Sequence, residues 1–218
     1  MTLAIFDLDN TLLAGDSDHA WGEFLVEEGL VDAEDYRKAN DRFYQEYLDG
    51  ELDMLEYQRF SLEPLTHHNL EELEGWRETF MAKKVQSMLL NKAKQLLADH
   101  QSQGHTLMII TATNRFITEP IAELLGVPHL IATEPELVNG RFTGQIAGTP
   151  SFQEGKVTRL NDWLAANQEN LEGAWFYSDS HNDAPLLRRV DHPVAVDPDP
   201  TLEALAREQG WRILSLRD

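Results

Sequence analysis

Two carboxylates, one residue apart, follow the first apolar run of the sequence. Residues 4–6 are Ala-Ile-Phe, and Asp7 and Asp9 come directly after them. Because residues two apart in a strand point to the same side, both side chains converge at the carboxyl edge of the predicted strand. Binding sites of open α/β sheets lie at that edge. Mg²⁺ takes few carboxylates and keeps water or phosphate oxygens, so the pair favours a Mg²⁺ site; a solvated Asx turn at Asn10 is the alternative.

A second apolar strand ends in the same way much later in the chain. Residues 175–178 are Trp-Phe-Tyr-Ser, and Asp179 follows them. Parallel strands present their carboxyl ends at one edge, so Asp179 would complete the Mg²⁺ shell with the Asp7 carboxylate and the main-chain carbonyl of Asp9. The metal ligands predicted from the sequence are therefore Asp7, Asp9 and Asp179.

Three polar residues are predicted to support these ligands. Lys156 follows Gly155 at a predicted helix start, where a positive charge opposes the helix dipole. An isolated Lys would be a surface residue, whereas one facing a carboxylate–phosphate pair offsets negative charge that builds up during phosphoryl transfer. Asn182 and Asp183 suit groups that orient the ligand, water and Lys156. For Asp183 an N-cap of the following helix is the alternative role.

A threonine ends another buried strand. Residues 106–111 form a continuous apolar run bounded by polar residues, as in a parallel strand buried on both faces. The Thr111 hydroxyl, with the amides of Ala112 and Thr113, could hold phosphate oxygens at the start of the next helix. We therefore predict phosphate binding by Thr111, Ala112, Thr113 and Lys156.

These residue types suit transfer of a phosphoryl group. The Asp7 carboxylate could attack phosphorus and form an aspartyl-phosphate, which splits hydrolysis into two easier steps. Asp9 could protonate the leaving alcohol and then activate water. The catalytic residues expected are Asp7, Asp9, Thr111 and Lys156.

The elements that must position these residues alternate between strands and helices, apart from one helical block. The alternation predicts a doubly wound parallel α/β sheet. We expect a core of residues 1–15 and 82–218 and a helical cap of residues 16–81 without strands. Further expectations are one long helix over 82–100, a helix over 114–125, a hairpin over 136–144 around Asn139-Gly140, and a helix over 156–166.

Composition limits the partners. The 218-residue chain has a formal net charge of −20, which opposes binding to nucleic acid or to anionic membranes. It has no Cys, so no thiolate can act as nucleophile or metal ligand. Residues 16–80 hold 19 acidic against 5 basic residues; this is either a solvated surface suited to a salty cytoplasm or part of a site that selects a cationic substrate. No signal peptide or spanning helix is apparent, so a cytoplasmic protein is expected, as monomer or homodimer.

The four motifs together resemble those of the haloacid-dehalogenase-like phosphohydrolases. The pattern DxDxT at Asp7, the strand-end Thr111, Lys156 and the SDxxxD pattern at Asp179 occur in the family's order. The resemblance is closest to the phosphoserine-phosphatase-like branch, whose helical cap follows the first motif, and to its proteobacterial group that includes histidinol-phosphatases. It implies a Mg²⁺-dependent phosphatase of amino-acid biosynthesis with a Rossmann-like core. A dehalogenase is disfavoured, because those relatives lack the acid at the position of Asp9.

Residues entering the cap are expected to select the substrate. Asp16 and Asp18 could meet an ammonium group, His19 could hydrogen-bond or stack with a ring, and Arg59 could read a carboxylate. Asp16 and Arg59 resemble positions that grip the amino acid in phosphoserine phosphatases, although Arg59 could equally pair with cap acids. Histidinol phosphate carries an ammonium and an imidazole but no carboxylate, so an acid-rich cap favours it over phosphoserine. A catalytically silent module that binds a phosphorylated ligand is the alternative of another class.

Overall fold

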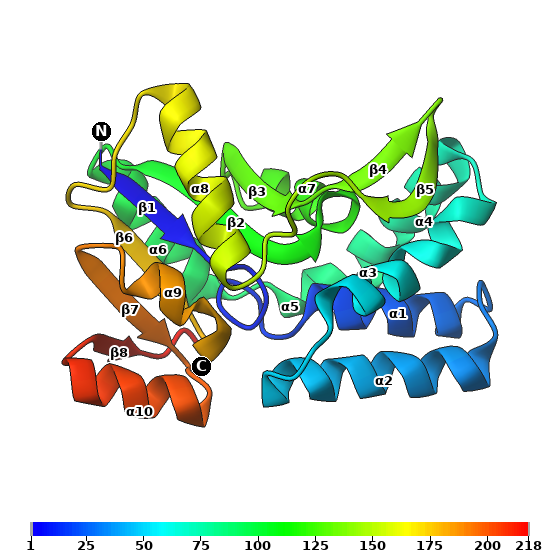
Figure 1. The fold of residues 1–218 in the computed structure, drawn as a ribbon, viewed down its shortest axis with the longest axis horizontal. Coiled ribbons are helices and arrows are strands. Elements are labelled where there is room, and N and C mark those ends of the chain that lie inside the picture. The colour runs from blue at the N-terminus through cyan, green and yellow to red at the C-terminus, as the bar shows by residue number, and fades with distance from the viewer. Residues whose placement is uncertain (1, 218) are drawn as a thin grey trace.

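The apolar runs that precede the acidic residues form the centre of one parallel sheet. A computed structural model describes residues 2–217. Six strands lie in the order β3-β2-β1-β6-β7-β8, and each neighbouring pair is parallel. Their bounds are Leu3–Phe6 (β1), Thr106–Asn114 (β2), His129–Thr133 (β3), Trp175–Ser178 (β6), His192–Val196 (β7) and Arg212–Leu214 (β8). The expected doubly wound, Rossmann-like fold is confirmed (Figure 1).

Helices cover both faces of this sheet. Along β1, Phe6 joins the apolar cluster that contains Leu97, and Ile5 joins the opposite cluster that contains Leu160. This follows from the period of two in a strand, because successive side chains point to opposite faces. One face carries α6 (Asn91–Ser102) and α7 (Arg115–Leu124), and the other carries α8 (Glu154–Asn167), α9 (Ala184–Leu187) and α10 (Pro200–Gln209).

The order in which strands are added to the sheet reverses at the central strand β1. The chain continues to β2 and β3 on one side of β1 and to β6, β7 and β8 on the other. The main-chain N–H of Asp7 donates to the carbonyl oxygen of Tyr177 at 2.9 Å, so the segments beyond β1 and β6 stay together past the strand ends. Such a switch point opens a crevice at the carboxyl edge of the sheet.

A block of helices is inserted between β1 and β2, as expected. Its elements are α1 (Ser17–Glu27), α2 (Ala33–Asp49), α3 (Met54–Leu62), a 3₁₀ helix (Glu63–His67), α4 (Leu70–Phe80), a π-helical turn (Met81–Val85) and α5 (Gln86–Met88). The four longer helices begin with a polar side chain that accepts hydrogen bonds from first-turn amides: Asp16, Asp32, Asp53 and Asn69. Gly29 and Gly50 lie at helix ends with φ of 69° and 74°, so part of the acidity serves helix starts and two glycines end helices.

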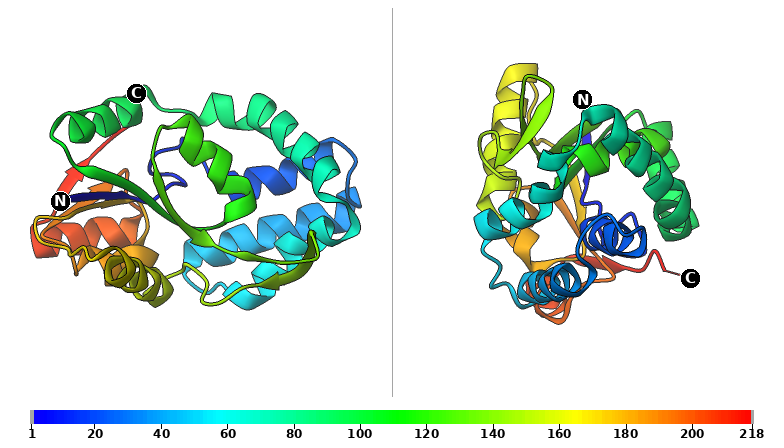
Figure 2. Two further views of the ribbon diagram at one scale, coloured as in Figure 1. Left: turned by 90° about the horizontal axis from the view of Figure 1, so that it is seen from above. Right: turned by 90° about the vertical axis from the view of Figure 1, so that its right-hand side faces the viewer.

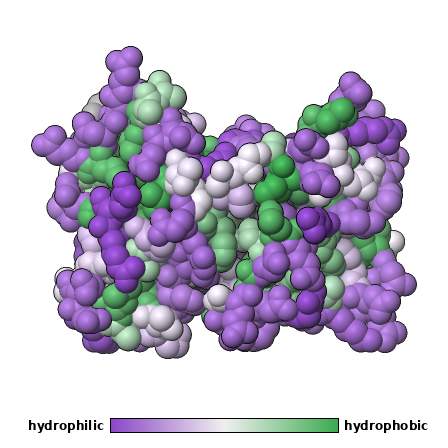
Figure 3. All heavy atoms as spheres, in the orientation of Figure 1, coloured by the Kyte–Doolittle hydropathy of each residue, from purple (hydrophilic) through white to green (hydrophobic). Residues whose placement is uncertain are grey.

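The insertion lies off the carboxyl edge of the sheet. Figures 1 and 2 show α1 to α4 at the end of the molecule toward which β1 points, and both chain termini at the other end. Its surface is mostly hydrophilic in the view of Figure 3. Among residues 2–217, no helix has both the length and the apolar composition needed to cross a bilayer.

The single long helix expected over residues 82–100 is wrong. The helical path stops after Met88, and Leu89 and Leu90 are extended before α6 begins. Leu89 forms an antiparallel bridge with Leu13, and the Ala14 N–H donates to the Met88 carbonyl at 2.7 Å. The two connections between sheet and insertion thus pair with each other. Leucines continue an apolar helical pattern, so the sequence carries no sign of this tertiary break.

The predicted hairpin is confirmed. Strands β4 (Pro135–Val138) and β5 (Arg141–Ile146) are antiparallel, and the turn residues Asn139 and Gly140 have φ of 52° and 75°. Positive φ at both turn positions is the reason for the Asn-Gly pair. The hairpin contacts α3 and the 3₁₀ helix of the insertion, so the helical block packs on a β element contributed by the core (Figure 1).

Candidate active site

The structure brings the strand-end carboxylates together. Asp7 and Asp9 follow β1, and Asp179 follows β6. Thr11 links two of them: its hydroxyl donates to Asp179 Oδ1 at 3.0 Å, accepts from the Asp179 main-chain N–H at 3.0 Å, and lies 3.4 Å from Asp7 Oδ2. Thr11 is part of the sequence motif, yet no role was assigned to it from sequence. It fixes the distance between two carboxylates that come from different strands.

Lys156 reaches the same point from α8. Its Nζ lies 2.7 Å from Asp7 Oδ1 and 2.8 Å from the Asp183 carboxylate, which also accepts from the Ser178 hydroxyl at 2.7 Å. The Lys156 side chain is 3% exposed. Burial alone would lower the pKa of Lys156, but Asp183 and Asp7 outweigh burial and raise that pKa above its usual value. Lys156 is therefore a fixed positive charge beside Asp7. The Asp183 side chain makes no N-cap hydrogen bond to α9, so the alternative role does not apply.

Local backbone geometry explains why a Gly precedes this Lys. A Cβ on Gly155 would collide with the carbonyl oxygen of Pro150. Gln153, at the start of α8, has φ 47° and ψ −120°, a backbone conformation that residues other than Gly rarely adopt. The tight turn before α8 thus needs Gly155, and it delivers Lys156 to the sheet edge.

Excess negative charge marks the region around Asp7. Burial raises the pKa of Asp7 to about 7; Lys156 opposes this rise, while Asp183 and Asp9 add to it. Burial, together with Asp7 and Asp183, also raises the pKa of Asp179 well above its usual value. One lysine does not neutralise four neighbouring carboxylates, so a cation bound there would stabilise their charged forms.

The donor set fits Mg²⁺. The Asp7 and Asp179 side chains supply hard oxygen ligands, and the main-chain carbonyl of Asp9 is the third predicted ligand. Among residues 2–217, no three His, Asp or Glu side chains are grouped so as to hold a metal by themselves. Main-chain, water or phosphate oxygens must complete the shell, which is the habit of Mg²⁺.

The Asp9 carboxyl group turns away from Lys156 and toward the insertion. Its Oδ1 accepts from the main-chain N–H of Ser17 at 2.6 Å, and its Oδ2 accepts from the Thr113 hydroxyl at 2.9 Å. Burial, followed by the charge of Asp16, raises the pKa of Asp9 to about 6. A carboxyl group of this kind can hold and release a proton near neutral pH, as a general acid and base must.

The predicted phosphate-binding segment lies at the site but in a different local structure. Strand β2 runs to Asn114, three residues beyond the predicted strand end at Thr111, and α7 begins only at Arg115. The Thr113 N–H donates to the Thr111 hydroxyl at 3.2 Å, and the Thr111 hydroxyl lies 3.4 Å from Asp9 Oδ2. The expected strand end at Thr111 is therefore wrong, because β2 resumes pairing with β3 at Asn114. The helix expected over 114–125 is present as α7, with Asn114 as its N-cap. The hydroxyls of Thr111 and Thr113 hold Asp9.

Asn182 joins the sheet edge to the insertion. Its Oδ1 accepts from Gln153 at 2.9 Å, and its Nδ2 lies 3.3 Å from the carbonyl oxygen of Tyr47 near the end of α2. In this structure Asn182 contacts neither Asp7 nor Lys156 through a hydrogen bond. Any orienting effect would act through the position of α2 and the start of α8.

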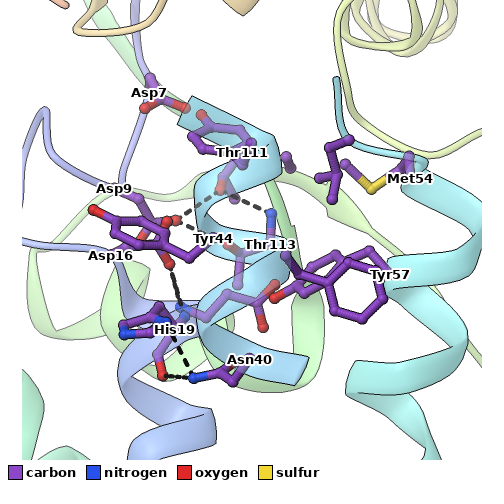
Figure 4. A pocket seen from close by; sticks show the side chains of 15 residues that line it. Asp7, Asp9, Asp16, His19, Asn40, Tyr44, Met54, Tyr57, Thr111 and Thr113 are labelled. Atoms are coloured by element: carbon purple, nitrogen blue, oxygen red, sulfur yellow. Dashed lines mark hydrogen bonds between the residues drawn. The ribbon is translucent and has the colours of Figure 1, made fainter. Parts of the chain in front are cut away.

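A cavity of about 520 Å³, including its open mouth, begins at Asp7 and extends into the insertion (Figure 4). Its walls are acidic and aromatic side chains together with the end of β2. The lining residues are Asp7, Asp9, Asp16, Asp18, His19, Asn40, Phe43, Tyr44, Tyr47, Leu52, Met54, Tyr57, Thr111, Ala112 and Thr113.

Three of the four predicted substrate-binding residues line this cavity. Asp16, Asp18 and His19 do so, whereas Arg59 is exposed on α3 and is not part of the lining. Trp21, which is close to them in the sequence, is 1% exposed and packs in the apolar core instead of lining the cavity. Burial is the main cause that raises the pKa of Asp16 and of Asp18 to about 7 each.

Sequence reasoning missed the aromatic part of the cavity. The Tyr44 ring stacks on His19 at 4.6 Å, and the Tyr57 hydroxyl lies near enough to the Asp18 carboxyl group to lower the pKa of Asp18. Asn40 Nδ2 lies 3.1 Å from His19 Nδ1 and 3.0 Å from the His19 carbonyl oxygen. The positions of Asn40 and Tyr44, four apart on α2, place them on one helix face, a spacing visible in the sequence.

The fold and the carboxylate–lysine centre define a Rossmann-like hydrolase with a helical insertion. The match to the haloacid dehalogenase-like hydrolase family covers residues 4–188, and the chain belongs to this family. A histidinol-phosphatase of Neisseria meningitidis serogroup C is 45% identical over 219 residues, which cover 99% of each chain. The resemblance inferred from the four motifs and the expected class of enzyme, a phosphatase, are thereby confirmed.

Solved structures agree with this fold. A protein of unknown function from Bordetella pertussis Tohama I superposes with a TM-score of 0.94 at 43% identity, covering all of both chains. A phosphoserine phosphatase superposes with a TM-score of 0.72 at 17% identity, covering 99% of this chain and 93% of that one. At that identity the second likeness shows the fold alone.

Proposed function

We propose that this protein is a Mg²⁺-dependent phosphomonoesterase that acts on a small aminated metabolite, with histidinol phosphate as the leading substrate. The observation that carries the proposal is the charge of the cavity. Four carboxylates line it, and no Lys or Arg is among its lining residues; Lys156 lies behind Asp7, bound to two carboxylates. An amine farther into the insertion would meet complementary negative charge, whereas a phosphate at Asp7 would depend on the positive charge of Lys156 and of a bound Mg²⁺.

Asp7 and Asp9 are suited to the two chemical steps of this reaction. A carboxylate oxygen of Asp7 attacks phosphorus, the bond from phosphorus to the alcohol oxygen breaks, and Asp9 gives its proton to the departing oxygen. Asp9 then takes a proton from a water molecule whose oxygen attacks phosphorus, which releases inorganic phosphate and restores the Asp7 carboxylate. Lys156 favours the ionised form of Asp7 and offsets charge on the transferring group. The hydroxyls of Thr111 and Thr113 hold Asp9 toward the cavity.

Asp7, Asp179 and the main-chain carbonyl of Asp9 would hold Mg²⁺. When bound, the ion supplies positive charge that draws phosphate to these two carboxylates and stabilises charge on the phosphate oxygens. Thr11 and Asp183 act on this arrangement as positioning residues through their contacts with Asp179 and Lys156.

The cavity favours histidinol phosphate over phosphoserine. Phosphoserine carries a carboxylate, which would meet Asp16 and Asp18 without a cationic partner, since Arg59 is exposed elsewhere on α3. Histidinol phosphate offers an ammonium and an imidazole instead. The 45% identity to the Neisseria histidinol-phosphatase supports the same choice. We propose residues 16–81 as the cap that makes this selection.

A panel of phosphate esters tests the proposal. Initial rates with Mg²⁺ are compared for histidinol phosphate, phosphoserine and 4-nitrophenyl phosphate, and the esters are ranked by kcat/KM. We expect hydrolysis of all three, with histidinol phosphate first. A higher kcat/KM for phosphoserine would mean that phosphoserine is the preferred substrate, while the proposed phosphatase mechanism would still hold. If no ester is hydrolysed, the proposal is wrong, and a catalytically silent module that binds a phosphorylated ligand is the alternative.

A further inference from the structure

One buried oxygen of the cavity wall lacks a hydrogen-bond partner. Asp18, in the first turn of α1, is 7% exposed and lines the cavity, and its Oδ1 has no partner in the structure. A buried acceptor left unpaired destabilises the protein unless a ligand or another group supplies a donor. The position of this oxygen therefore points to a donor on the substrate.

The neighbouring acid, Asp16, is used differently. Its Oδ1 accepts from the N–H groups of Asp18 and His19 at 2.9 and 2.8 Å, and so caps α1. The Asp18 side chain does not cap the helix in this way. A substitution at Asp18 therefore changes the cavity wall without removing the helix cap, which makes it a cleaner probe than Asp16.

Tyr57 is a neighbour of Asp18 from another helix. It comes from α3, lines the same cavity, and its hydroxyl lies near enough to the Asp18 carboxyl group to lower the pKa of Asp18. Because Asp18 and Tyr57 belong to two different helices of the insertion, their contact sets where the unpaired oxygen lies relative to the core. Tyr57 is thus a positioning residue for Asp18.

A rigid aromatic wall lies in the same part of the cavity. Tyr44 stacks on His19 with ring centroids 4.6 Å apart and an interplanar angle of 25°, and Asn40 holds His19 through two contacts. Figure 4 shows Asp7 at one end of the drawn side chains, His19 and Asn40 at the other, and Tyr44 and Tyr57 between them. A flat substituent on the substrate would find an aromatic face here, and an acid beside it.

We propose that Asp18, held by Tyr57, accepts a hydrogen bond from the ring N–H of the substrate's imidazole, and that this contact distinguishes a ring-bearing amino phosphate from one without a ring. The inference rests on the proposed function. It gives the two acids at the start of α1 separate roles: Asp16 faces the ammonium common to several aminated esters, whereas Asp18 binds the ring.

Three esters separate these roles. Histidinol phosphate carries ammonium and ring, phosphoethanolamine carries an ammonium without a ring, and 4-nitrophenyl phosphate carries neither an ammonium nor an N–H donor. The kcat/KM of each is measured for the wild type, Asp18→Asn, Tyr57→Phe and Asp16→Asn. Loss of a charge-assisted hydrogen bond should lower kcat/KM of Asp18→Asn on histidinol phosphate by about ten- to a hundredfold. The other two esters should change by less than about threefold.

The remaining variants test the division of roles. Tyr57→Phe should show the same selectivity with a smaller loss, because the acid remains but is less well placed. Asp16→Asn should lower kcat/KM on both aminated esters more than on the aryl ester. Product inhibition supplies a readout without turnover: histidinol should inhibit Asp18→Asn more weakly than the wild type, while inhibition by inorganic phosphate stays the same.

The outcomes distinguish this inference from the proposed function. Equal losses of Asp18→Asn on both aminated esters would mean that Asp18 meets the ammonium, and would overturn the inference. Equal losses on all three esters, or weaker inhibition by phosphate, would mean a role in folding or general catalysis and would also overturn it. In either case the wild type could still prefer histidinol phosphate. If the wild type itself does not prefer histidinol phosphate to phosphoethanolamine, the proposed substrate fails first.

Discussion

Gly50 lies directly against His181, where the insertion meets the sheet edge. A Cβ on Gly50 would come 2.7 Å from His181 Nε2. His181 cannot easily retreat, because its Nδ1 lies 2.8 Å from the Asp199 carboxylate and its main-chain N–H donates to the same oxygen at 2.6 Å. The end of α2 thus packs against the segment that follows Asp179. This contact links the position of the insertion to the geometry of the proposed catalytic centre.

We expect Gly50→Ala to lower kcat/KM on every substrate, aryl esters included, because α2 must shift away from His181. Gly29→Ala is a matched control: Gly29 also ends a helix at positive φ, but nothing lies within 4 Å of a Cβ there. Both variants should lose about 1–2 kcal/mol of unfolding free energy from the left-handed conformation. Only Gly50→Ala should lose activity in steady-state assays. Equal kinetic constants in the two variants would contradict the coupling.

A second prediction concerns the covalent step. Asp7→Asn should abolish turnover and leave the fold intact, because an amide is nearly isosteric with the acid but a poor nucleophile. Asp9→Asn should slow both steps and allow a phosphorylated protein to accumulate, which mass spectrometry of quenched reactions detects. Asp162→Asn, at an exposed position of α8, is the control. Normal steady-state activity in Asp7→Asn would end the aspartyl-phosphate mechanism.

A third prediction concerns the metal. Chelation should remove activity and Mg²⁺ should restore it, because Asp7 and Asp179 offer only oxygen ligands and the chain has no Cys. Asp179→Asn should raise the Mg²⁺ concentration needed for half-maximal rate, measured by titration of the stripped enzyme. Full activity without metal, or recovery with Zn²⁺ alone, is the result that contradicts the assignment.

Features that follow from local sequence patterns could be predicted, whereas features that depend on contacts with distant segments could not. The meeting of Asp7 and Asp179 at one sheet edge was predictable, because the carboxyl ends of parallel strands lie together and period-two spacing fixes side-chain direction. The break at Leu89 was not, because it depends on pairing with Leu13, which no local pattern reports. The continuation of β2 to Asn114 likewise depends on its partner strand β3.

The cavity wall was harder to predict for a different reason. The aromatic residues Phe43, Tyr44 and Tyr47 recur at helical spacing on α2, but no local pattern shows that this face lines a cavity instead of packing in the apolar core. Tyr57 and Arg59 lie two residues apart on α3, and only the packing of that helix places Tyr57 in the cavity and Arg59 outside it.

Arg59 supplies the fourth prediction. Because its side chain is exposed and does not line the cavity, Arg59→Ala should change kcat/KM on histidinol phosphate and on phosphoserine by less than about twofold. Arg37→Ala, at an exposed position of α2, is the control for lost positive charge on the acidic insertion. A large loss confined to phosphoserine would show that Arg59 reaches a substrate carboxylate, and would favour phosphoserine as the substrate.

The last prediction concerns His100, a buried histidine on α6 outside the catalytic centre. Its Nε2 lies 2.8 Å from the Tyr177 hydroxyl, and its Nδ1 lies 2.7 Å from Nδ1 of His105. Burial, followed by the charge of His105, lowers the pKa of His100 from 6.5 to about 4. The folded protein therefore keeps this ring neutral at pH values where the unfolded chain takes up a proton. Its contribution to stability is complete above about pH 6.5, falls as pH decreases, and levels off below about pH 4.

Urea denaturation between pH 7 and pH 4 tests this contribution in the wild type and in His100→Gln. Asp16 and Asp18 have pKa values raised by burial, so they act in the opposite direction, and only the difference between the two proteins isolates His100. The unfolding free energy of the wild type minus that of His100→Gln should decrease as pH falls through this range. His105→Gln should make the decrease smaller, because it removes the neighbouring charge that helps to lower the pKa of His100. A difference that stays constant with pH would mean that His100 is protonated equally in both states, and that its ring is not held neutral by the fold.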